Sequence, residues 1–428
     1  MDTYGHIIKF ERIRQNVKQA QLSEGICSPA YLSKIESNSI VPSVQVRDAL
    51  FKRLNIKPST PSMSEDDYLK HVHTIYFEAI MYKDRQKTAT FLEELQKTQF
   101  LFINPSNFYT FQLKILRLSL IAFNSQKPTQ DIIKSISLMK KDFNDYQNFM
   151  FKLNLGFFNF MNQNHLHSLK FLEDAFDLVQ RVKCEAWETA DLEYALALVY
   201  LSLDRNVNSI EFNEKAVLFF EREFYYKRAI ESYIILGIVY RRIEKHKEAV
   251  EILQLAKKIS IELNIKDNYP HVFFNLGTIA SEQGDLDLAI ESFEEALNLR
   301  SDIPGKVLCL YALMLVYAKK KDTDSVIFFC KKGIELCNNE QDNLLENTIH
   351  HFNCYLSRFS KFENFEETFK TAVSYFDKKN ENQYSHKYSL QLAQYYLANK
   401  KYKNAATYFS LANEFLAKKE SRNYSEDI

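Results

Sequence analysis

A fixed spacing of large and small residues recurs along most of this chain of 428 residues. Its clearest copy begins at Pro270 and ends at Pro304, with Phe273 at the fourth position, Gly277 at the eighth and Phe293 at the twenty-fourth. Alanines occupy its eleventh, twentieth and twenty-seventh positions. The small residues let two helices of a hairpin approach closely, and the large residues fill the space between them. Because one hairpin cannot bury its apolar face alone, neighbouring copies must stack on one another.

This spacing is typical of the tetratricopeptide repeat, a unit of two helices. The eighth position of the repeat is found in seven copies, as Gly156, Ala197, Gly237, Gly277, Met314, Asn353 and Ala393. Glycine and proline contribute only eight residues each, so helices must dominate. The sequence therefore predicts an all-α protein that contains a right-handed α-solenoid of tetratricopeptide type.

Charged residues are distributed unevenly along the chain. Lysine plus arginine and aspartate plus glutamate number 55 each, but the first 60 residues contain nine basic and five acidic side chains. A basic head on a mildly acidic body is typical of a nucleic-acid-binding module joined to another domain. The six cysteines form no C-x-x-C pair, and no signal peptide or membrane-length apolar run is found. We therefore expect a cytoplasmic protein with reduced cysteines and no membrane partner.

The basic N-terminal segment has the pattern of several short helices. Apolar residues form a helical stripe in residues 4–17, and a second, shorter helix is expected at 19–23. Gly25 is suited to a left-handed turn, and Ser28 followed by Pro29 is a typical start of a third helix. Two short helices joined by a tight turn are the layout of a helix-turn-helix DNA-binding domain.

Residues 22–43, LSEGICSPAYLSKIESNSIVPS, resemble the repressor-type helix-turn-helix family. Gly25-Ile26-Cys27 is similar to the shortened turn of one subgroup, the peptide-sensing transcription regulators of Gram-positive bacteria of the NprR and PlcR kind. In those regulators, tetratricopeptide repeats follow the head, and Rap proteins resemble the NprR-like ones in the solenoid. The glycine usual after the third helix is replaced here by Asn38, which also tolerates a left-handed conformation. The resemblance is strongest to the NprR-like members.

Five segments are expected along the chain. They are a helix-turn-helix DNA-binding domain at 1–57, a linker at 58–64, degenerate helical hairpins capping the solenoid at 65–148, seven tetratricopeptide repeats at 149–418 and a flexible tail at 419–428. The capping region should contain four helices, at about 65–82, 86–99, 106–123 and 129–146.

Motifs of catalysis are missing from the sequence. There is no phosphate-binding loop, no H-E-x-x-H and no G-x-S-x-G. The pairs His71-x-His73 and His165-x-His167 would point away from each other on a helix, so they do not indicate a metal site. We therefore expect no enzyme, no metal and no cofactor.

For the head, the resemblance implies residues that contact DNA in the major groove. The third helix would present Ser28, Tyr31, Ser33 and Lys34, while Gln19 at the start of the second helix would reach a phosphate or a base edge. Lys34 is expected to grip phosphate. The alternative is a head that packs on the solenoid and binds nothing.

For the solenoid, the groove lined by the first helix of each repeat is the natural binding surface. The groove-facing repeat positions give the candidate peptide-binding residues Asn154, Arg241, Arg242, Asn275, Thr278, Glu282, Lys319 and Arg358. An asparagine can pair with both the N–H and the C=O of an extended peptide, and the arginines suit a carboxylate. We expect Arg241, Arg242 and Asn275 to face one cavity. The alternative is that each of these residues is an ordinary solvated side chain.

Together these features predict a cytoplasmic quorum-sensing transcription regulator. It would bind DNA through its head and a short signalling peptide in the groove, and the peptide would switch its oligomeric state or head geometry. A homo-oligomer, dimer or higher, is expected because one short reading helix carries little sequence information. The alternative function is a protein-binding module that sequesters or dephosphorylates a response regulator of the sporulation phosphorelay.

Overall fold

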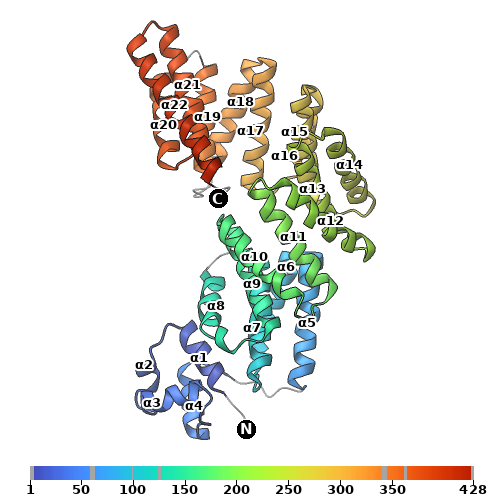
Figure 1. Ribbon diagram of the computed structural model, residues 1–428, viewed down its shortest axis with the longest axis vertical. Coiled ribbons are helices and arrows are strands. Elements are labelled where there is room, and N and C mark those ends of the chain that lie inside the picture. Colours follow the sequence, from blue (N-terminus) through green and yellow to red (C-terminus); the bar gives the residue numbers. More distant parts are fainter. Residues whose placement is uncertain are drawn as a thin grey trace. The chain divides into compact units, whose positions relative to one another are not determined.

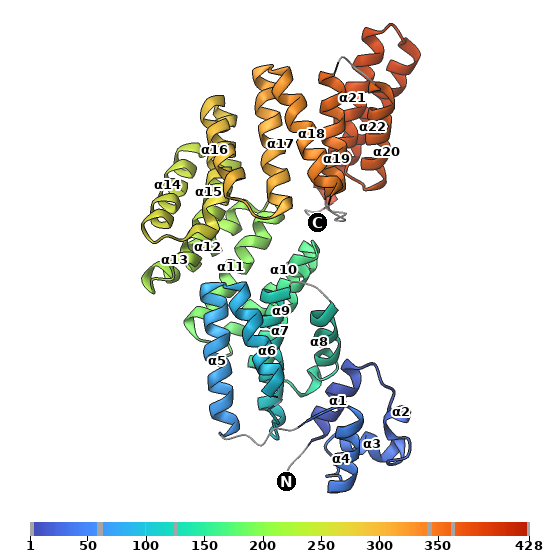
Figure 2. The ribbon, with the colours of Figure 1, turned by 180° about the vertical axis from the view of Figure 1, so that it is seen from behind.

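A computed structural model describes residues 4–57, 63–98, 100–123, 127–339, 345–360 and 364–425 of the chain. All regular secondary structure in these ranges is helical, which confirms the all-α prediction (Figures 1 and 2). The chain forms two compact units, residues 1–264 and residues 265–428.

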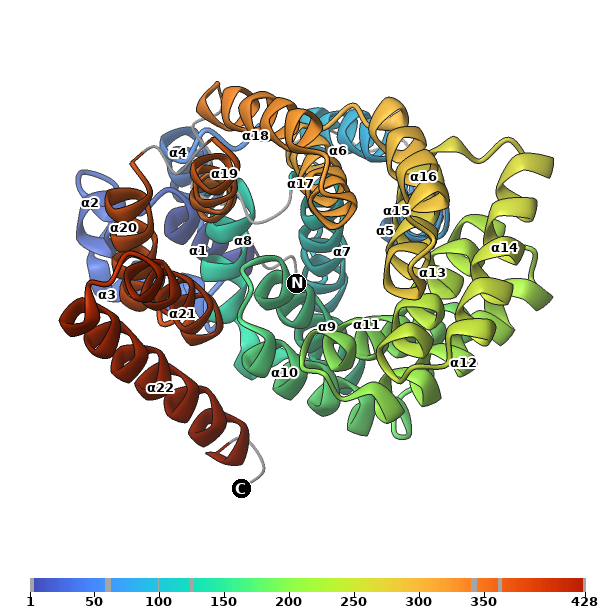
Figure 3. The ribbon, with the colours of Figure 1, turned by 90° about the horizontal axis from the view of Figure 1, so that it is seen from above.

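The first unit begins with the head helices α1 (Gly5–Arg14), α2 (Gln19–Ser23), α3 (Pro29–Glu36) and α4 (Val44–Arg53). Four further helices are α5 (Glu65–Tyr82), α6 (Arg85–Thr98), α7 (Pro105–Phe123) and α8 (Lys127–Ser137). Three hairpins follow, α9 (Asp145–Met161) with α10 (His165–Val179), α11 (Ala186–Ser202) with α12 (Asn206–Arg222), and α13 (Tyr226–Arg242) with α14 (His246–Glu262). These hairpins lie side by side in chain order (Figure 3).

The second unit contains four hairpins of the same kind. Their helices are α15 (Tyr269–Gln283), α16 (Leu286–Leu299), α17 (Ile303–Lys320), α18 (Thr323–Asn338), α19 (Glu346–Phe359), α20 (Phe365–Lys378), α21 (Asn382–Ala398) and α22 (Tyr402–Ser425). α22 continues into the expected tail because residues 402–425 contain no glycine or proline to stop it. Residues 58–62 of the expected linker and 426–428 of the tail lie outside the described residues. The domain boundaries stay a prediction.

The start of α3 has the local structure that its sequence predicts. Ser28 accepts a hydrogen bond from the Tyr31 N–H at 3.2 Å, and Pro29 occupies the first turn. Gly25 has a φ of 71° and Asn38 a φ of 54°, so both adopt the expected left-handed conformation. Leu32 is fully buried in the head.

The helix expected at 129–146 is wrong in length, since α8 ends at Ser137. Asn144 caps the next helix by accepting from the Gln147 N–H at 2.9 Å, and the Gln147 side chain accepts in return from the Asn144 N–H. A capping residue needs an extended backbone, so α8 cannot run through it. Phe143 is extended as well.

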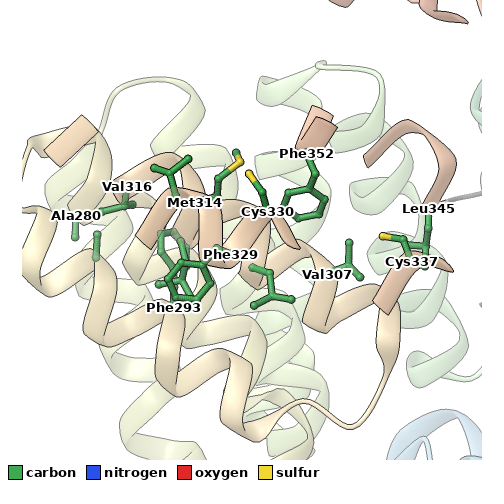
Figure 4. Close-up of a cluster of buried hydrophobic side chains, with 14 residues drawn as sticks. Ala280, Phe293, Val307, Met314, Val316, Phe329, Cys330, Cys337, Leu345 and Phe352 are labelled. Carbon is green, nitrogen blue, oxygen red and sulfur yellow. The ribbon is translucent and has the colours of Figure 1, made fainter. Parts of the chain in front are cut away.

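In the hairpins whose eighth repeat position holds a small residue, that residue allows close packing of the two helices. A β-carbon on Gly156 would lie 2.3 Å from Leu172, and one on Gly237 would lie 2.6 Å from Leu253. Side chains from α15 to α19 then meet in one apolar cluster, which includes Phe293 (Figure 4). The sequence pattern therefore corresponds to real contacts between paired helices.

The turn inside a hairpin uses one backbone conformation in copy after copy. Its φ is positive at Gln163 (60°), Asp204 (56°), Glu244 (60°), Gly284 (87°), Lys321 (60°) and Lys400 (58°). All six residues are at the fifteenth position of the repeat, and among these six only Gly284 is a glycine. A β-carbon in this conformation costs on the order of 1 kcal/mol. The flanking helices therefore impose the turn, whatever the side chain.

A buried group of charged residues joins four helices of the first unit. The Asp191 carboxylate on α11 accepts from Arg117 Nη2 on α7 at 2.7 Å and from Arg228 Nη2 on α13 at 3.0 Å. Arg228 also donates from Nη1 to the Ile80 carbonyl on α5, at 3.0 Å. Burial alone would raise the pKa of Asp191, but the two arginines lower it below its usual value. Asp191 is therefore ionised and held by two cations.

A histidine is buried among aromatic rings in the second unit. The ring of His351 on α19 lies 4.9 Å from the Phe376 ring and 4.5 Å from the Tyr384 ring, between centroids. Its Nδ1 is hydrogen-bonded to the Tyr388 hydroxyl. Burial lowers the pKa of His351 to about 3, and nearby Lys387 adds to this effect. The ring is therefore neutral near pH 7.

Replacing Asp191 tests the buried ion group. Asp191→Asn leaves two buried arginines without their shared charge, so the free energy of unfolding should fall by about 3–5 kcal/mol. Trp187, the single tryptophan, lies one turn earlier in α11, and its fluorescence reports urea unfolding there. The control Asp174→Asn removes a partly exposed ion pair with Lys152 and should cost below about 1 kcal/mol. Equal losses in the two variants would contradict this role.

The buried His351 makes stability depend on pH. In the unfolded chain it binds a proton below about pH 6.5, whereas the native ring binds one only near pH 3. Stability is therefore complete above the unfolded pKa and is lost as pH falls toward the native one. His351→Asn does not titrate, so its thermal midpoint should fall less between about pH 7 and 5 than that of the wild type. Parallel calorimetric curves would exclude His351 as the source.

Candidate functional site

The predicted DNA-binding residues lie on or beside α3. Ser33 and Lys34 are exposed on this helix and Tyr31 is half-buried, while Leu32 and Ile35 are fully buried on its other side. α3 therefore presents a polar and basic face opposite the face that packs in the head. A helix that enters the major groove needs this arrangement.

Two of the predicted DNA contacts already have partners inside the head. The Ser28 hydroxyl is the N-cap of α3 and accepts from the Tyr31 N–H. Gln19 donates from Nε2 to Glu36 Oε2 at 2.7 Å. The Ser28 hydroxyl can still donate and Gln19 Oε1 can still accept, so neither hydrogen bond excludes a contact with DNA. Both residues thus serve first to hold α2 and α3 in place.

An ion pair that the sequence analysis does not single out holds α1 against α3. Arg12 donates from Nε and Nη2 to the two carboxylate oxygens of Glu36, at 2.6 and 2.8 Å. The Glu36 side chain is only 3% exposed, and Gln19 binds the same carboxylate. A carboxylate beside the apolar stripe of Leu32 and Ile35 is the sequence signal for this pair.

The head also packs on the helices that follow it. His6 on α1 donates from Nε2 to the Phe102 carbonyl at 2.9 Å, and its ring lies edge-on to Phe108 of α7. Phe10 contacts the same Phe108 ring, with centroids 5.4 Å apart. A cleft of about 970 Å³ remains between this part of α1 and helices α6, α7 and α8. The docking contact uses α1, so Ser33 and Lys34 on α3 stay exposed.

Asn154, a predicted peptide contact, does not lie on an open surface. It is 1% exposed on α9, and its Nδ2 donates to the Leu113 carbonyl of α7 at 2.9 Å. Within the part of the chain that the structure describes, its Oδ1 is buried and lacks a hydrogen-bond partner. Asn154 joins two helices because α7 covers the position that the repeat register assigns to a ligand.

Arg241 and Arg242 are the last residues of α13, in the first unit. Arg242 donates from Nη1 to the Leu201 carbonyl at 2.6 Å and to the Asp204 carboxylate at 2.7 Å, both at the end of α11. Its side chain is about one-third exposed, and Arg241 is half-buried. The charge of Arg242 is thus partly compensated. The prediction that these arginines share a cavity with Asn275 joins residues of both units and stays a prediction.

Three predicted peptide contacts lie on α15 in the second unit. Asn275, Thr278 and Glu282 are three and four residues apart, which places them on one side of the helix. Asn275 Nδ2 donates to the His271 carbonyl at 2.8 Å, and the Thr278 hydroxyl donates to the Phe274 carbonyl at 2.9 Å. These bonds to the residues' own helix orient both side chains.

The remaining two candidates lie on the next two first helices. Lys319 on α17 donates from Nζ to the carbonyl and hydroxyl oxygens of Ser281, at 2.9 and 3.0 Å. Ser281 follows Thr278 by three residues, so Lys319 reaches the polar side of α15. Arg358 is exposed on α19, with its guanidinium 5.9 Å from the centre of the Phe359 ring.

A second group on the first helices escapes the sequence analysis. The Tyr311 ring lies 5.5 Å from His351, and Lys387 Nζ lies 5.3 Å from the centres of the Tyr355 and Tyr388 rings. In the repeat register Tyr311, His351 and Lys387 are at positions five, six and two, which face the groove. The register itself was the signal that points to them.

In the part of the chain that the structure describes, no three His, Cys, Asp or Glu side chains form a set that can hold a metal ion. None of the described helices combines the length and apolarity needed to cross a bilayer.

Comparison with known proteins finds both modules. Residues 8–60 match the helix-turn-helix family, and residues 228–302 match the tetratricopeptide repeat family. Over 403 residues the chain is 28% identical to the transcriptional activator NprA of Geobacillus stearothermophilus. That match covers 92% of this chain and 98% of NprA.

Two solved structures have a similar fold. The apo form of the quorum sensor NprR from B. thuringiensis matches with a TM-score of 0.70 and 16% identity, over 82% of this chain and 100% of that one. NprR in complex with its cognate peptide NprX matches with a TM-score of 0.62 and 15% identity, over 82% and 99%. NprA is described as a transcriptional activator, and the two solved structures share the fold of this chain. Over most of its length, the chain resembles the NprR-like regulators of Gram-positive bacteria, with a helix-turn-helix head ahead of tetratricopeptide repeats.

Proposed function

We propose that this protein is a quorum-sensing transcription regulator that binds DNA through α3 and a short peptide on its repeat helices. The observation that carries the proposal is the combination, in one chain, of an exposed basic α3 with a polar stripe along α15. The description of NprA as a transcriptional activator supports the first activity. The description of NprR as a quorum sensor with a cognate peptide supports the second.

DNA recognition would use two heads. α3 has only eight residues, so one head reads few base pairs and a dimer on two related half-sites supplies the specificity. Lys34 would contact phosphate and Ser33 a base edge. Ser28 and Gln19 would act mainly by fixing α2 and α3 at the angle that Arg12 and Glu36 set.

Peptide recognition would use the polar side of α15 with Lys319. The Asn275 amide can donate to and accept from the backbone of an extended peptide, which lacks internal partners. Its bond to the His271 carbonyl is exposed, so exchanging it costs little. Glu282 and Lys319 carry opposite charges, a combination that suits a peptide better than an apolar metabolite.

Peptide binding would act as a population shift. A ligand that binds one arrangement of the repeats better than another changes the oligomeric contact or the geometry of the heads. In the first unit, His6 and Phe10 of the head contact Phe108 of α7. A displacement of α7 would therefore alter the position of the head.

Lys34→Ala tests the DNA-binding surface. Loss of one phosphate contact per head should weaken binding to every sequence and reduce the slope of log affinity against log salt by about one per head. The measurement is fluorescence anisotropy of the full-length protein with DNA fragments selected by the wild type. Lys247→Ala is the control, because that side chain is 86% exposed on α14. Wild-type affinity and slope in Lys34→Ala would place the DNA contact elsewhere.

Asn275→Ala tests the peptide-binding surface. Mass spectrometry of the protein purified from its own host should first identify a short bound peptide. The variant should then bind that peptide about 1–3 kcal/mol less tightly, a loss of about 5- to 150-fold, through an unsatisfied peptide amide. Calorimetry measures this, with the exposed Asn298→Ala on α16 as the control. If Asn275→Ala binds the peptide with unchanged affinity, the peptide-binding surface lies elsewhere. If a response-regulator protein co-purifies and no peptide does, the alternative function is favoured.

A further inference from the structure

Lys387 on α21 is a half-buried ammonium group among aromatic rings. Its Nζ lies 5.3 Å from the centres of the Tyr355 and Tyr388 rings. Burial lowers the pKa of Lys387; the neighbouring Cys354 opposes this effect and Arg358 adds to it. A second cation thus stands near an ammonium group that has already lost much of its water.

Three acidic residues that the structure describes in this region have other partners. Glu346 accepts from the Tyr375 hydroxyl at 2.9 Å, Glu366 pairs with a lysine at 2.7 Å, and Glu381 accepts from an asparagine at 2.6 Å. Among the residues that the structure describes, no carboxylate lies within 4.0 Å of the Lys387 ammonium or the Arg358 guanidinium. This surface therefore carries positive charge that the described part of the fold does not compensate.

Such an arrangement lowers stability without improving the packing. Removing an ammonium group from water is unfavourable, and ring faces recover only part of the loss. A methionine would fill the same space without that cost. An ammonium at this place is explained if it has an anionic partner outside the chain.

We propose that Lys387 and Arg358, with the rings of Tyr311, Tyr355 and Tyr384, form a subsite for a carboxylate of the bound peptide. The rings of Tyr311 and Tyr384 both pack against the His351 ring, with centroids 5.5 and 4.5 Å away, and Tyr355 follows His351 by one turn of α19, so the three tyrosines lie in one region. The inference rests on the proposed peptide-binding function and names the chemical group that the second unit recognises. A C-terminal carboxylate and an acidic side chain offer the same chemistry.

The geometry suits a carboxylate better than a neutral group. Rings around Lys387 reduce the screening by water and strengthen its attraction to an anion. Arg358 is exposed and can bind a carboxylate through two parallel N–H groups.

The first test uses a small carboxylate probe on the full-length protein. Fluorine NMR should show 4-fluorobenzoate binding at least about tenfold more tightly than the neutral 4-fluorobenzamide. Lys387→Met should abolish this preference, and Lys247→Met should keep it. Equal binding of the two probes by the wild type, or an unchanged preference in Lys387→Met, overturns the proposal.

A stability measurement separates binding from folding. The thermal midpoint of Lys387→Met should equal or exceed that of the wild type, because the variant removes a desolvated cation. If the thermal midpoint of Lys387→Met falls, the Arg358→Gln variant tests the subsite instead, because the Arg358 side chain is exposed and outside the core. A several-fold loss of 4-fluorobenzoate affinity in Arg358→Gln supports the subsite, and wild-type affinity overturns it.

The second test identifies the source of the carboxylate. Pools of synthetic seven-residue peptides, with free or amidated C-termini, are captured by wild type and by Lys387→Met. Preference for free acids assigns the C-terminus, and enrichment of Asp or Glu among amides assigns a side chain. If the protein retains peptides but shows neither preference, the carboxylate subsite is overturned and the proposed peptide-binding function stands. If 4-fluorobenzoate binding depends on Lys387 but the protein retains no peptide, the anion subsite is supported and the proposed peptide-binding function fails.

Discussion

A buried carboxylate joins helices that lie far apart in the sequence of the first unit. Helices within a hairpin pack through apolar contacts that recur from copy to copy, whereas α7 is also held to the hairpin helices by polar contacts, among them the Asn154–Leu113 hydrogen bond. Asp191 binds Arg117 of α7 and Arg228 of α13, and Arg228 also donates to the Ile80 carbonyl of α5. Ionic contacts in a dry interior are specific in direction and distance. The helices before the repeats are therefore held in one defined position.

The same contacts give the first unit an unbroken path from the repeats to the head. α7 binds Asp191 through Arg117 and meets the head through Phe108, which contacts His6 and Phe10. α7 is thus shared by the repeats and the head. A displacement of α7 would therefore alter contacts in both places, and a second stable position of this helix is what signal transmission through it would require. Helix α3 takes no part in these contacts, and its residues Ser33 and Lys34 stay exposed.

Local patterns in the sequence predict local structure well, and long-range pairs poorly. The close packing at Gly156 and Gly237 and the cap at Ser28 depend on residues near one another in the chain, and the structure has them as predicted. The Arg12–Glu36 pair and the burial of Asn154 depend on which helix covers a position, which no spacing reveals. The groove register names candidate ligand contacts but cannot show which of them another helix already occupies. The helix predicted at 129–146 is too long because the Asn144 cap begins a new helix inside that range.

The repeated left-handed turn has a practical consequence for measuring motion. The fifteenth repeat position is exposed in six hairpins and already holds Gln, Asp, Glu, Gly or Lys without a change in backbone conformation. A cysteine there is no more strained than Glu244 or Lys321. These six sites are equivalent attachment points, one in each of six hairpins, for spin or fluorescent labels. Distances between labelled pairs would report changes in the arrangement of the hairpins, and no core side chain would be altered.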